Sequence, residues 1–207
     1  MKLLVDNLTC VRGGRDVLQG VSFSVAGGAG LKLTGVNGSG KTTLLRTVAG
    51  FLRPGSGSVD LEGGAVDREL AEQLHYVGHL DGVKTALTVH ENLAFWQRFL
   101  TGRQSDDVLC VALDKFSLNE LAEIPAGYLS AGQRRRLGLS RLLVAERPIW
   151  LLDEPTVSLD SQSQAVMGDV VNEHLARGGI VVAATHMPLA MDLGDELELG
   201  RQHERVC

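Results

Sequence analysis

The chain has 207 residues, which suits a single domain over residues 1–207, because domains typically span about 50 to 250 residues. Its formal net charge of −5 argues against a general electrostatic attraction to nucleic acid. No segment approaches the roughly 18 apolar residues needed to cross a bilayer. Cys10, Cys110 and Cys207 lie far apart in the sequence, so they form neither a metal-binding spacing nor a disulfide framework.

The first predicted elements are two strands, Lys2–Leu8 and Val17–Val25, joined by a turn at Gly13-Gly14. A third apolar segment begins at Ala29 and runs into Gly35-Val36-Asn37-Gly38-Ser39-Gly40-Lys41-Thr42, which has the spacing of a P-loop. Its glycines allow backbone conformations closed to other residues, so successive N–H groups can converge on phosphate oxygens. The helix expected over residues 42–50 points the positive end of its dipole at the same anion. The segment therefore predicts a triphosphate site.

Each side chain at the end of this loop has a predicted role. Lys41 would reach the β- and γ-phosphates, and the Thr42 hydroxyl would bind Mg²⁺. The alternative is a glycine-rich turn that happens to end in Lys-Thr, which the strand before it and the apolar helix after it disfavour. The residues expected to contact the nucleotide are Gly35, Val36, Asn37, Gly38, Ser39, Gly40, Lys41, Thr42 and Thr43.

The middle of the chain is predicted to be helical. A turn at residues 53–57 precedes a strand at Ser58–Glu62. A capping box at Thr88–Glu91 then starts a helix to roughly Thr101, and a second helix is expected over Asp106–Phe116. We expect a helical subdomain over about residues 85–146. Most of the following apolar residues should be core, and a few exceed what one helix face can bury and are expected to dock onto a partner: Val89, Leu93, Phe95, Trp96 and Phe99.

A further helix is expected to begin after Leu129-Ser130-Ala131-Gly132-Gln133 and to continue to about Glu146. Ser130 is the expected N-cap, and the small residues behind it allow an anion to approach the exposed N–H groups. The three arginines at 134–136 are interpreted as a solvated helix face and not as a DNA-binding patch.

Residues 147–155 predict a buried strand that ends in two carboxylates, Asp153 and Glu154. Ligands of open α/β sheets bind at the carboxyl ends of such strands. Asp153 would hold Mg²⁺ through water opposite Thr42. Glu154 could accept a proton from the attacking water. The alternative is a helix N-cap followed by a first-turn acid, which Pro155 disfavours because it delays the next helix.

These ordered motifs resemble the ATP-binding cassette (ABC) ATPases over essentially the whole chain. Leu129–Gln133 is similar to the signature motif of the family, with Ala131 where glycine is usual. The resemblance implies a homodimer in which Ser130, Gly132 and Gln133 of one copy close on ATP held by the P-loop of the other. Thr156–Asp160 resembles the D-loop. His186, after a strand-like run at Ile180–Ala184, matches the switch histidine that bonds the γ-phosphate.

Two positions depart from the family pattern. Many cassettes stack an aromatic side chain on adenine where this chain has Arg12. A planar guanidinium can also stack on a base, and an exposed arginine in a turn remains the alternative. The family usually places glutamine, which touches Mg²⁺ and the attacking water, where this chain has His79. A neutral imidazole can accept a hydrogen bond from a metal-bound water.

The resemblance implies an α/β fold: a P-loop NTPase of ABC type with an antiparallel β-layer, a parallel core sheet and the inserted helical subdomain. Within the family, the chain is similar to the ATP-binding subunits of bacterial haem exporters used in cytochrome c maturation. That similarity is carried by the short length and by Tyr76–His79, Ile124–Gln133 and Gly178–Val182.

This closer resemblance implies a homodimer at the cytoplasmic face of the bacterial inner membrane, bound to two multi-spanning membrane subunits. ATP hydrolysis would drive haem export or the release of a haem-loaded periplasmic chaperone. No residue of the chain is an obvious haem ligand, so the cargo rests on resemblance alone.

Three alternatives stay open at this point. The chain could energise another short ABC transporter with a different cargo, because cargo is chosen by membrane subunits. It could be a cytosolic ABC ATPase outside transport, although such proteins carry tandem cassettes or a long coiled coil. It could also be a regulatory module that uses ATP only to dimerise, which Glu154 and His186 argue against.

Overall fold

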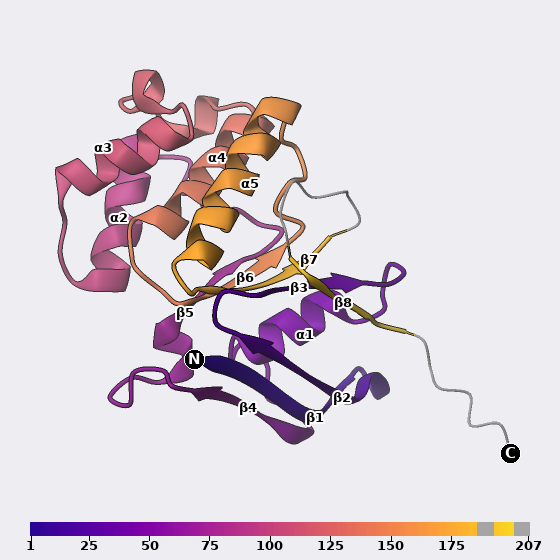
Figure 1. Ribbon diagram of the computed structural model, residues 1–207. Coiled ribbons are helices and arrows are strands. Elements are labelled where there is room, and N and C mark those ends of the chain that lie inside the picture. The colour runs from indigo at the N-terminus through magenta and orange to yellow at the C-terminus, as the bar shows by residue number, and fades with distance from the viewer. Residues whose placement is uncertain (186–192, 201–207) are drawn as a thin grey trace, which may run out of the picture.

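The computed structural model describes residues 1–185 and 193–200, which form two sheets and the helices around them (Figure 1). The antiparallel sheet has the strand order β2-β1-β4, with β1 at Lys2–Arg12, β2 at Arg15–Ala26 and β4 at Ser56–Glu62. The second sheet is parallel and has the order β5-β6-β7-β3-β8. Its strands are β5 (Leu74–Val77), β6 (Ile149–Asp153), β7 (Ile180–Ala184), β3 (Gly30–Thr34) and β8 (Asp195–Glu198).

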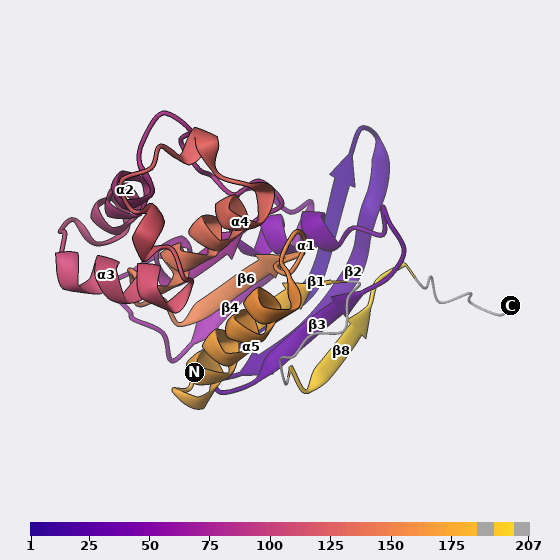
Figure 2. The same ribbon diagram turned by 90° about the horizontal axis from the view of Figure 1, so that it is seen from above.

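The helices cover both faces of the parallel sheet. One helix, α1 (Lys41–Val48), lies between the two sheets (Figure 1). The other face is covered by α2 (Val89–Thr101), α3 (Asp106–Lys115), α4 (Ala131–Ser140) and α5 (Ser161–Ala176). Seen from above, α2, α3 and α4 gather on the side of the molecule away from β8 (Figure 2). Short 3₁₀ turns connect these elements at Leu70–Gln73, Asn119–Leu121, Ala126–Tyr128 and Arg141–Leu143.

The buried strands β6 and β7 divide the apolar core into two parts. Every residue of both strands is buried, and successive side chains of a strand point to opposite faces. Ile149 and Leu151 join the cluster around α1 and the antiparallel sheet, whereas Trp150 and Leu152 join the cluster under α2–α5. This explains why the sequence of β6 is a continuous apolar run: both of its faces are covered.

The predicted α/β architecture is therefore confirmed, with small corrections to element ends. The strands of the hairpin extend to Arg12 and begin at Arg15, so its turn is tighter than predicted. Helix α4 ends at Ser140 and continues as a 3₁₀ turn to Leu143, short of the expected Glu146. Strand β8 was not predicted, because its sequence Asp-Glu-Leu-Glu is short and mostly acidic. It forms because it pairs in parallel with β3.

Burial along the first middle helix confirms the prediction that most of its apolar residues are core and that a few exceed what one face can bury; Trp96 packs against the buried cluster. Val89 and Leu93 are fully buried, but Phe95 and Phe99 are 37% and 70% exposed. Phe99 contacts the rings of both Phe95 and Trp96, so the exposed aromatic side chains cover one another.

In the described residues, no helix is long and apolar enough to span a membrane.

Candidate functional site

The loop between β3 and α1 has the backbone that the P-loop spacing predicts. Gly35, Gly38 and Gly40 have φ values of 129°, 85° and 101°, all in the region that favours glycine. Two of these positions are also crowded. A Cβ atom at Gly35 would lie 2.3 Å from the carbonyl oxygen of Leu199, and one at Gly40 would lie 2.8 Å from Leu18 Cδ2. Space and conformation therefore both demand glycine at these two positions.

The side chains of this loop fit a bound phosphate chain. Lys41 is only 8% exposed, and its Nζ donates to the carbonyl oxygens of Gly35 and Val36 at 2.7 and 3.1 Å. This places the ammonium group at the loop itself. Ser39 Oγ is buried without a hydrogen-bond partner among the described residues. Thr42 is the exposed residue in the otherwise buried first turn of α1, where a cation bound to the phosphates would reach its hydroxyl.

Strand register brings most of the predicted residues to one edge of the parallel sheet. Leu33 pairs with Ala184, and Ala184 pairs with Asp153, so these residues lie in one row. The P-loop begins two residues after Leu33, and Glu154 follows Asp153 directly. The single strand β7 separates the two segments. Because neighbouring strands lie about 4.8 Å apart, the two segments are roughly 10 Å apart. A triphosphate with its cation can span that distance.

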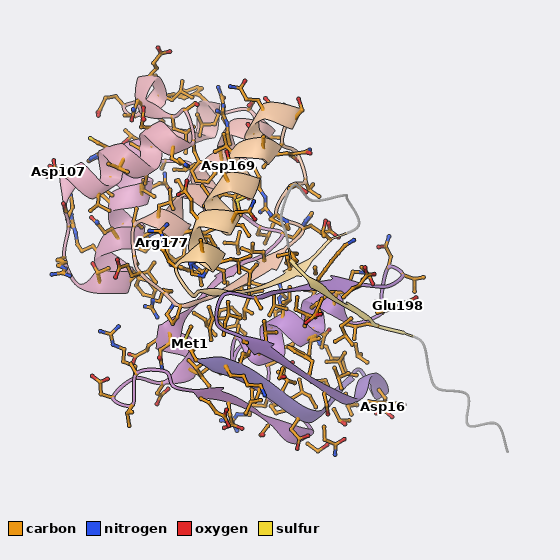
Figure 3. All side chains as sticks on the ribbon, viewed as in Figure 1. Met1, Asp16, Asp107, Asp169, Arg177 and Glu198 are labelled. Atoms are coloured by element: carbon orange, nitrogen blue, oxygen red, sulfur yellow. The ribbon has the colours of Figure 1, made fainter. Side chains whose placement is uncertain are left out.

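This carboxyl edge is distinct from the amino edge of the sheet (Figure 3). Glu198, at the end of β8, marks the carboxyl edge, whereas Met1 and Arg177 lie toward the amino edge. A hollow of about 540 Å³ at the amino edge is lined by Trp150, His174 and Arg177. None of the predicted site residues lines that hollow.

Asp153 and Glu154 differ in burial and in backbone. Asp153 ends β6 and is 4% exposed, whereas Glu154 is partly exposed and has a φ of 49°. A positive φ is uncommon in a residue with a side chain and persists only where the surroundings hold it. Here the Glu154 N–H donates to the carbonyl oxygen of Ala184 at 2.8 Å. The turn therefore directs Glu154 away from the path of the strand, at the edge that carries the P-loop.

Helix α1 is tied to β5 beside the acidic pair. Arg46 Nε donates to the Tyr76 hydroxyl at 3.3 Å. This hydrogen bond raises the pKa of Arg46, and burial raises the pKa of Tyr76. At neutral pH Arg46 therefore stays charged and the Tyr76 hydroxyl stays neutral. The sequence did not predict this hydrogen bond, because nothing in the spacing indicates that Arg46 of α1 meets Tyr76 of β5.

The predicted N-cap at Ser130 is present in the structure. Ser130 Oγ accepts from the Gln133 N–H at 3.2 Å, and Gln133 Oε1 accepts from the Ser130 N–H at 2.8 Å. The two side chains form a capping box that leaves Ser130 exposed at the start of α4. A Cβ atom at Gly132 would lie 3.0 Å from the carbonyl oxygen of Ser158, so the start of α4 packs against the loop after β6.

His79 follows β5 and is exposed. It lines a hollow of about 670 Å³ together with Ala131, Arg134, Val157 and Ser158. Three segments meet there: the loop after β5, the start of α4 and the loop after β6. His79 therefore lies at the same edge of the sheet as the acidic pair.

Two predicted residues are not brought into this arrangement by the described part of the chain. Arg12 is exposed at the end of β1, in the hairpin of the antiparallel sheet. His186 lies outside the described residues, directly after Thr185, which is buried at the end of β7. Because β7 lies between β3 and β6, Thr185 lies at the same edge as the P-loop and the acidic pair.

Arg135 is the residue that the sequence interpretation misplaced. The arginine run was expected to be solvated, but Arg135 is only 4% exposed and its guanidinium faces the acidic pair. Its neighbours Arg134 and Arg136 are partly exposed. Helical spacing could have signalled this, because Arg135 lies four residues before the buried Leu139 and thus on its face of α4.

Comparison with known proteins agrees with this geometry. The family model described as ABC transporter matches residues 18–157. The chain is 53% identical to the cytochrome c biogenesis ATP-binding export protein CcmA of Rhodopseudomonas palustris (strain HaA2), over 92% of this chain and 94% of that protein. It is 50% identical to the protein of the same name from Nitrobacter winogradskyi, over 97% and 98% of the two chains.

Solved structures show the same fold at lower sequence identity. A putative ABC transporter ATP-binding protein from Pyrococcus furiosus superposes with a TM-score of 0.83 at 24% identity, over 96% of this chain and 98% of that chain. An ATP-binding cassette of an ABC transporter in its ADP conformation superposes with a TM-score of 0.78 at 23% identity, over 96% and 87%. By its sequence, its fold and its P-loop, this chain belongs to the ABC transporter family, as an ATP-binding protein that hydrolyses ATP.

Proposed function

We propose that the chain is the ATP-hydrolysing subunit of an export system that serves cytochrome c biogenesis. The observation that carries this proposal is identity of 46–54% to cytochrome c biogenesis ATP-binding export proteins over nearly the full length of both chains. The geometry supports the ATPase part independently, since the P-loop and two carboxylates meet at one edge of the sheet.

The proposed reaction is attack of water on the γ-phosphorus of ATP, which breaks the bond between that phosphorus and the β–γ bridging oxygen and releases ADP and inorganic phosphate. The P-loop N–H groups and Lys41 would hold the phosphates, and Thr42 and Asp153 would hold Mg²⁺. When bound, Mg²⁺ neutralises charge on the β- and γ-phosphates. Glu154 accepts the proton of the attacking water, and His79 and His186 orient that water. Arg12 stacks on adenine. The loop conformation and the buried Ser39 Oγ support this assignment.

The proposed assembly is a head-to-tail homodimer with two ATP molecules between the copies. Ser130, Gly132 and Gln133 lie at an exposed helix start, which is open to contact from a second copy. Each copy would lend these residues to the ATP bound by the other. ATP then supplies contacts that close the dimer, and hydrolysis removes them.

The dimer would sit at the cytoplasmic face of the bacterial inner membrane, on two multi-spanning membrane subunits. Haem is the proposed cargo, passed to a periplasmic haem chaperone that the ATPase reaches only indirectly. We propose no nucleic-acid partner. The domain would span residues 1–207, with the helical subdomain at about 85–146 contacting the membrane subunits.

Purification tests the two levels of this proposal separately. A tagged copy isolated from membranes should bring down two membrane subunits, and porphyrin absorbance should accompany them. Phosphate release by the purified chain should depend on Mg²⁺ and be lost in Lys41→Ala, which removes the phosphate contact. Membrane partners without any porphyrin would replace the haem assignment with another cargo. Phosphate release that survives Lys41→Ala would contradict the ATP site itself.

A further inference from the structure

The side chain of Arg135 connects two segments of the candidate site to α4. Its guanidinium donates to three backbone carbonyls at the end of β6, those of Asp153 at 3.3 Å, Glu154 at 2.7 Å and Pro155 at 3.2 Å. It also donates to the Gly78 carbonyl at 2.9 Å and to Asp81 Oδ1 at 2.8 Å, in the loop that carries His79. Few side chains other than arginine present enough donors in one plane to make five such bonds.

Arg135 contacts Glu154, a residue whose backbone conformation is uncommon. Its φ of 49° is costly for a residue with a side chain and requires support from outside. That support comes from both sides of the residue: Ala184 accepts from its N–H, and Arg135 donates to its carbonyl. Arg135 therefore helps to determine where the Glu154 side chain points.

The contact with the His79 loop is equally direct. Asp81 pairs with Arg135 at 2.8 Å, with side chains that are 21% and 5% exposed. Gly138, one turn further along α4, lets this loop approach, because a Cβ atom there would lie 2.9 Å from Asp81 Cβ. Arg141 donates to the carbonyl oxygens of Tyr76 and Asp81. The loop is therefore packed onto α4 along two turns of the helix.

We propose that Arg135 is a positioning residue that couples the start of α4 to the hydrolytic edge of the sheet. A shift of α4, which carries Ser130, moves the guanidinium and with it both the Glu154 peptide and the His79 loop. Contact of Ser130 with ATP on a second copy would thereby set the orientation of Glu154. This inference rests on the proposed function in two respects, namely that Glu154 acts on water and that Ser130 contacts ATP held by a second copy.

Hydrogen exchange of the full-length chain measures this coupling without any turnover. Arg135→Lys retains the charge but loses the planar set of donors. We expect amide exchange to rise by about tenfold in both 78–82 and 153–157, since each loses its shared anchor. The matched control is Arg136→Lys, whose guanidinium donates to the carbonyls of Phe116 and Ser117 away from the site. Wild-type exchange in both segments of Arg135→Lys would overturn the proposal.

A second variant tests the coupling from the opposite end. Asp81→Ala leaves Arg135 in place but removes one of its acceptors in the His79 loop. The proposal requires exchange to rise at 153–157 as well as at 78–82. A rise confined to 78–82 would overturn it. This variant also decides the matter if Arg135→Lys does not fold.

Kinetics then distinguish positioning from simple loss of stability. Arg135→Lys should lower kcat by roughly tenfold to a hundredfold while KM for MgATP stays within about threefold, since a misaligned group costs rate more than binding. Arg136→Lys should keep both constants within about twofold. A kcat of Arg135→Lys equal to that of Arg136→Lys would overturn the proposal. Absence of turnover in wild type would contradict the proposed function, whereas the exchange data would still test Arg135.

Discussion

At the scale of single residues, Glu154 combines the position and the backbone expected of a general base. It follows the buried strand β6 directly, at the edge of the sheet where the P-loop lies, and its φ is positive. Asp153, one residue earlier, is almost fully buried and suits a metal ligand better than a base exposed to water. The neighbouring carboxylates therefore have different environments, which fits different roles.

Replacing Glu154 by glutamine tests the assignment of the base. Glu154→Gln should lower kcat for ATP hydrolysis by about 10²–10⁴-fold, because an amide cannot accept the proton. Nucleotide affinity, measured by fluorescence titration, should stay within about threefold of wild type, since the phosphate contacts remain. Turnover equal to wild type would assign the base to another residue.

At the scale of elements, the chain offers two capping boxes with nearly identical geometry. Thr88 caps α2 through a bond of 3.1 Å from the Glu91 N–H, with Glu91 Oε2 accepting from the Thr88 N–H at 2.8 Å. Ser130 caps α4 through bonds of 3.2 and 2.8 Å. Thr88 is predicted only to start a helix, whereas Ser130 is also predicted to contact ATP bound by a second copy.

This pair separates helix capping from nucleotide contact. Thr88→Ala and Ser130→Ala should each reduce the free energy of unfolding by about 1 kcal/mol in urea titrations, because each removes an N-cap. Only Ser130→Ala should also lower ATPase activity, by about tenfold if one contact to the γ-phosphate is lost. Equal activity in the two variants would leave Ser130 with a structural role alone.

At the scale of the whole molecule, stability should depend on two imidazoles beside Trp150: that of His75, which is buried, and that of His174, which is partly exposed. His75 Nε2 bonds the Ala145 carbonyl at 2.9 Å, and His174 stacks on Trp150 with ring centroids 3.8 Å apart. Burial lowers the pKa of His75 to about 3 and that of His174 to about 4. Both imidazoles are therefore neutral in the folded protein at pH 5–7, whereas in the unfolded chain they titrate near pH 6.5.

The sign of the resulting pH dependence follows from linkage. Below about pH 6.5 the unfolded chain takes up protons that folded His75 does not, so the stabilisation present above that pH is lost as pH falls toward 3. As the pH falls from 6 to 5, protonation of His75 in the unfolded chain should lower the free energy of unfolding by about 1 kcal/mol. Urea titrations of wild type and His75→Gln should differ in this slope, with the variant flatter. Identical slopes would show that His75 is protonated in the folded state.

The proposed dimer is also a property of the whole molecule. Glu154→Gln with MgATP should elute from a sizing column at twice the 22.2 kDa mass of one chain, because slow hydrolysis preserves the ATP contacts between copies. Without nucleotide, or with Lys41→Ala added, it should elute as a monomer. A monomer under all three conditions would contradict a shared ATP site.

The sequence by itself determined the local features of this protein. The P-loop, the capping boxes and the buried strand before Asp153 and Glu154 depend on residues close together in the chain. Glycine at positive φ, a serine before a helix and an unbroken apolar run each have a local physical cause. The two helices at 89–101 and 106–115 were predicted to within one residue at each end for the same reason.

Only the tertiary structure decided how distant segments meet. The interpretation of Arg134–Arg136 as a solvated face failed at Arg135, since burial of that side chain requires five acceptors from two segments remote in sequence. Strand β8 likewise exists through its pairing with β3, although its own sequence is acidic. Burial of a charged group and formation of a polar strand both remove groups from water, so they occur only where partners distant in the chain replace the lost hydrogen bonds. The spacing of residues along the sequence does not identify those partners.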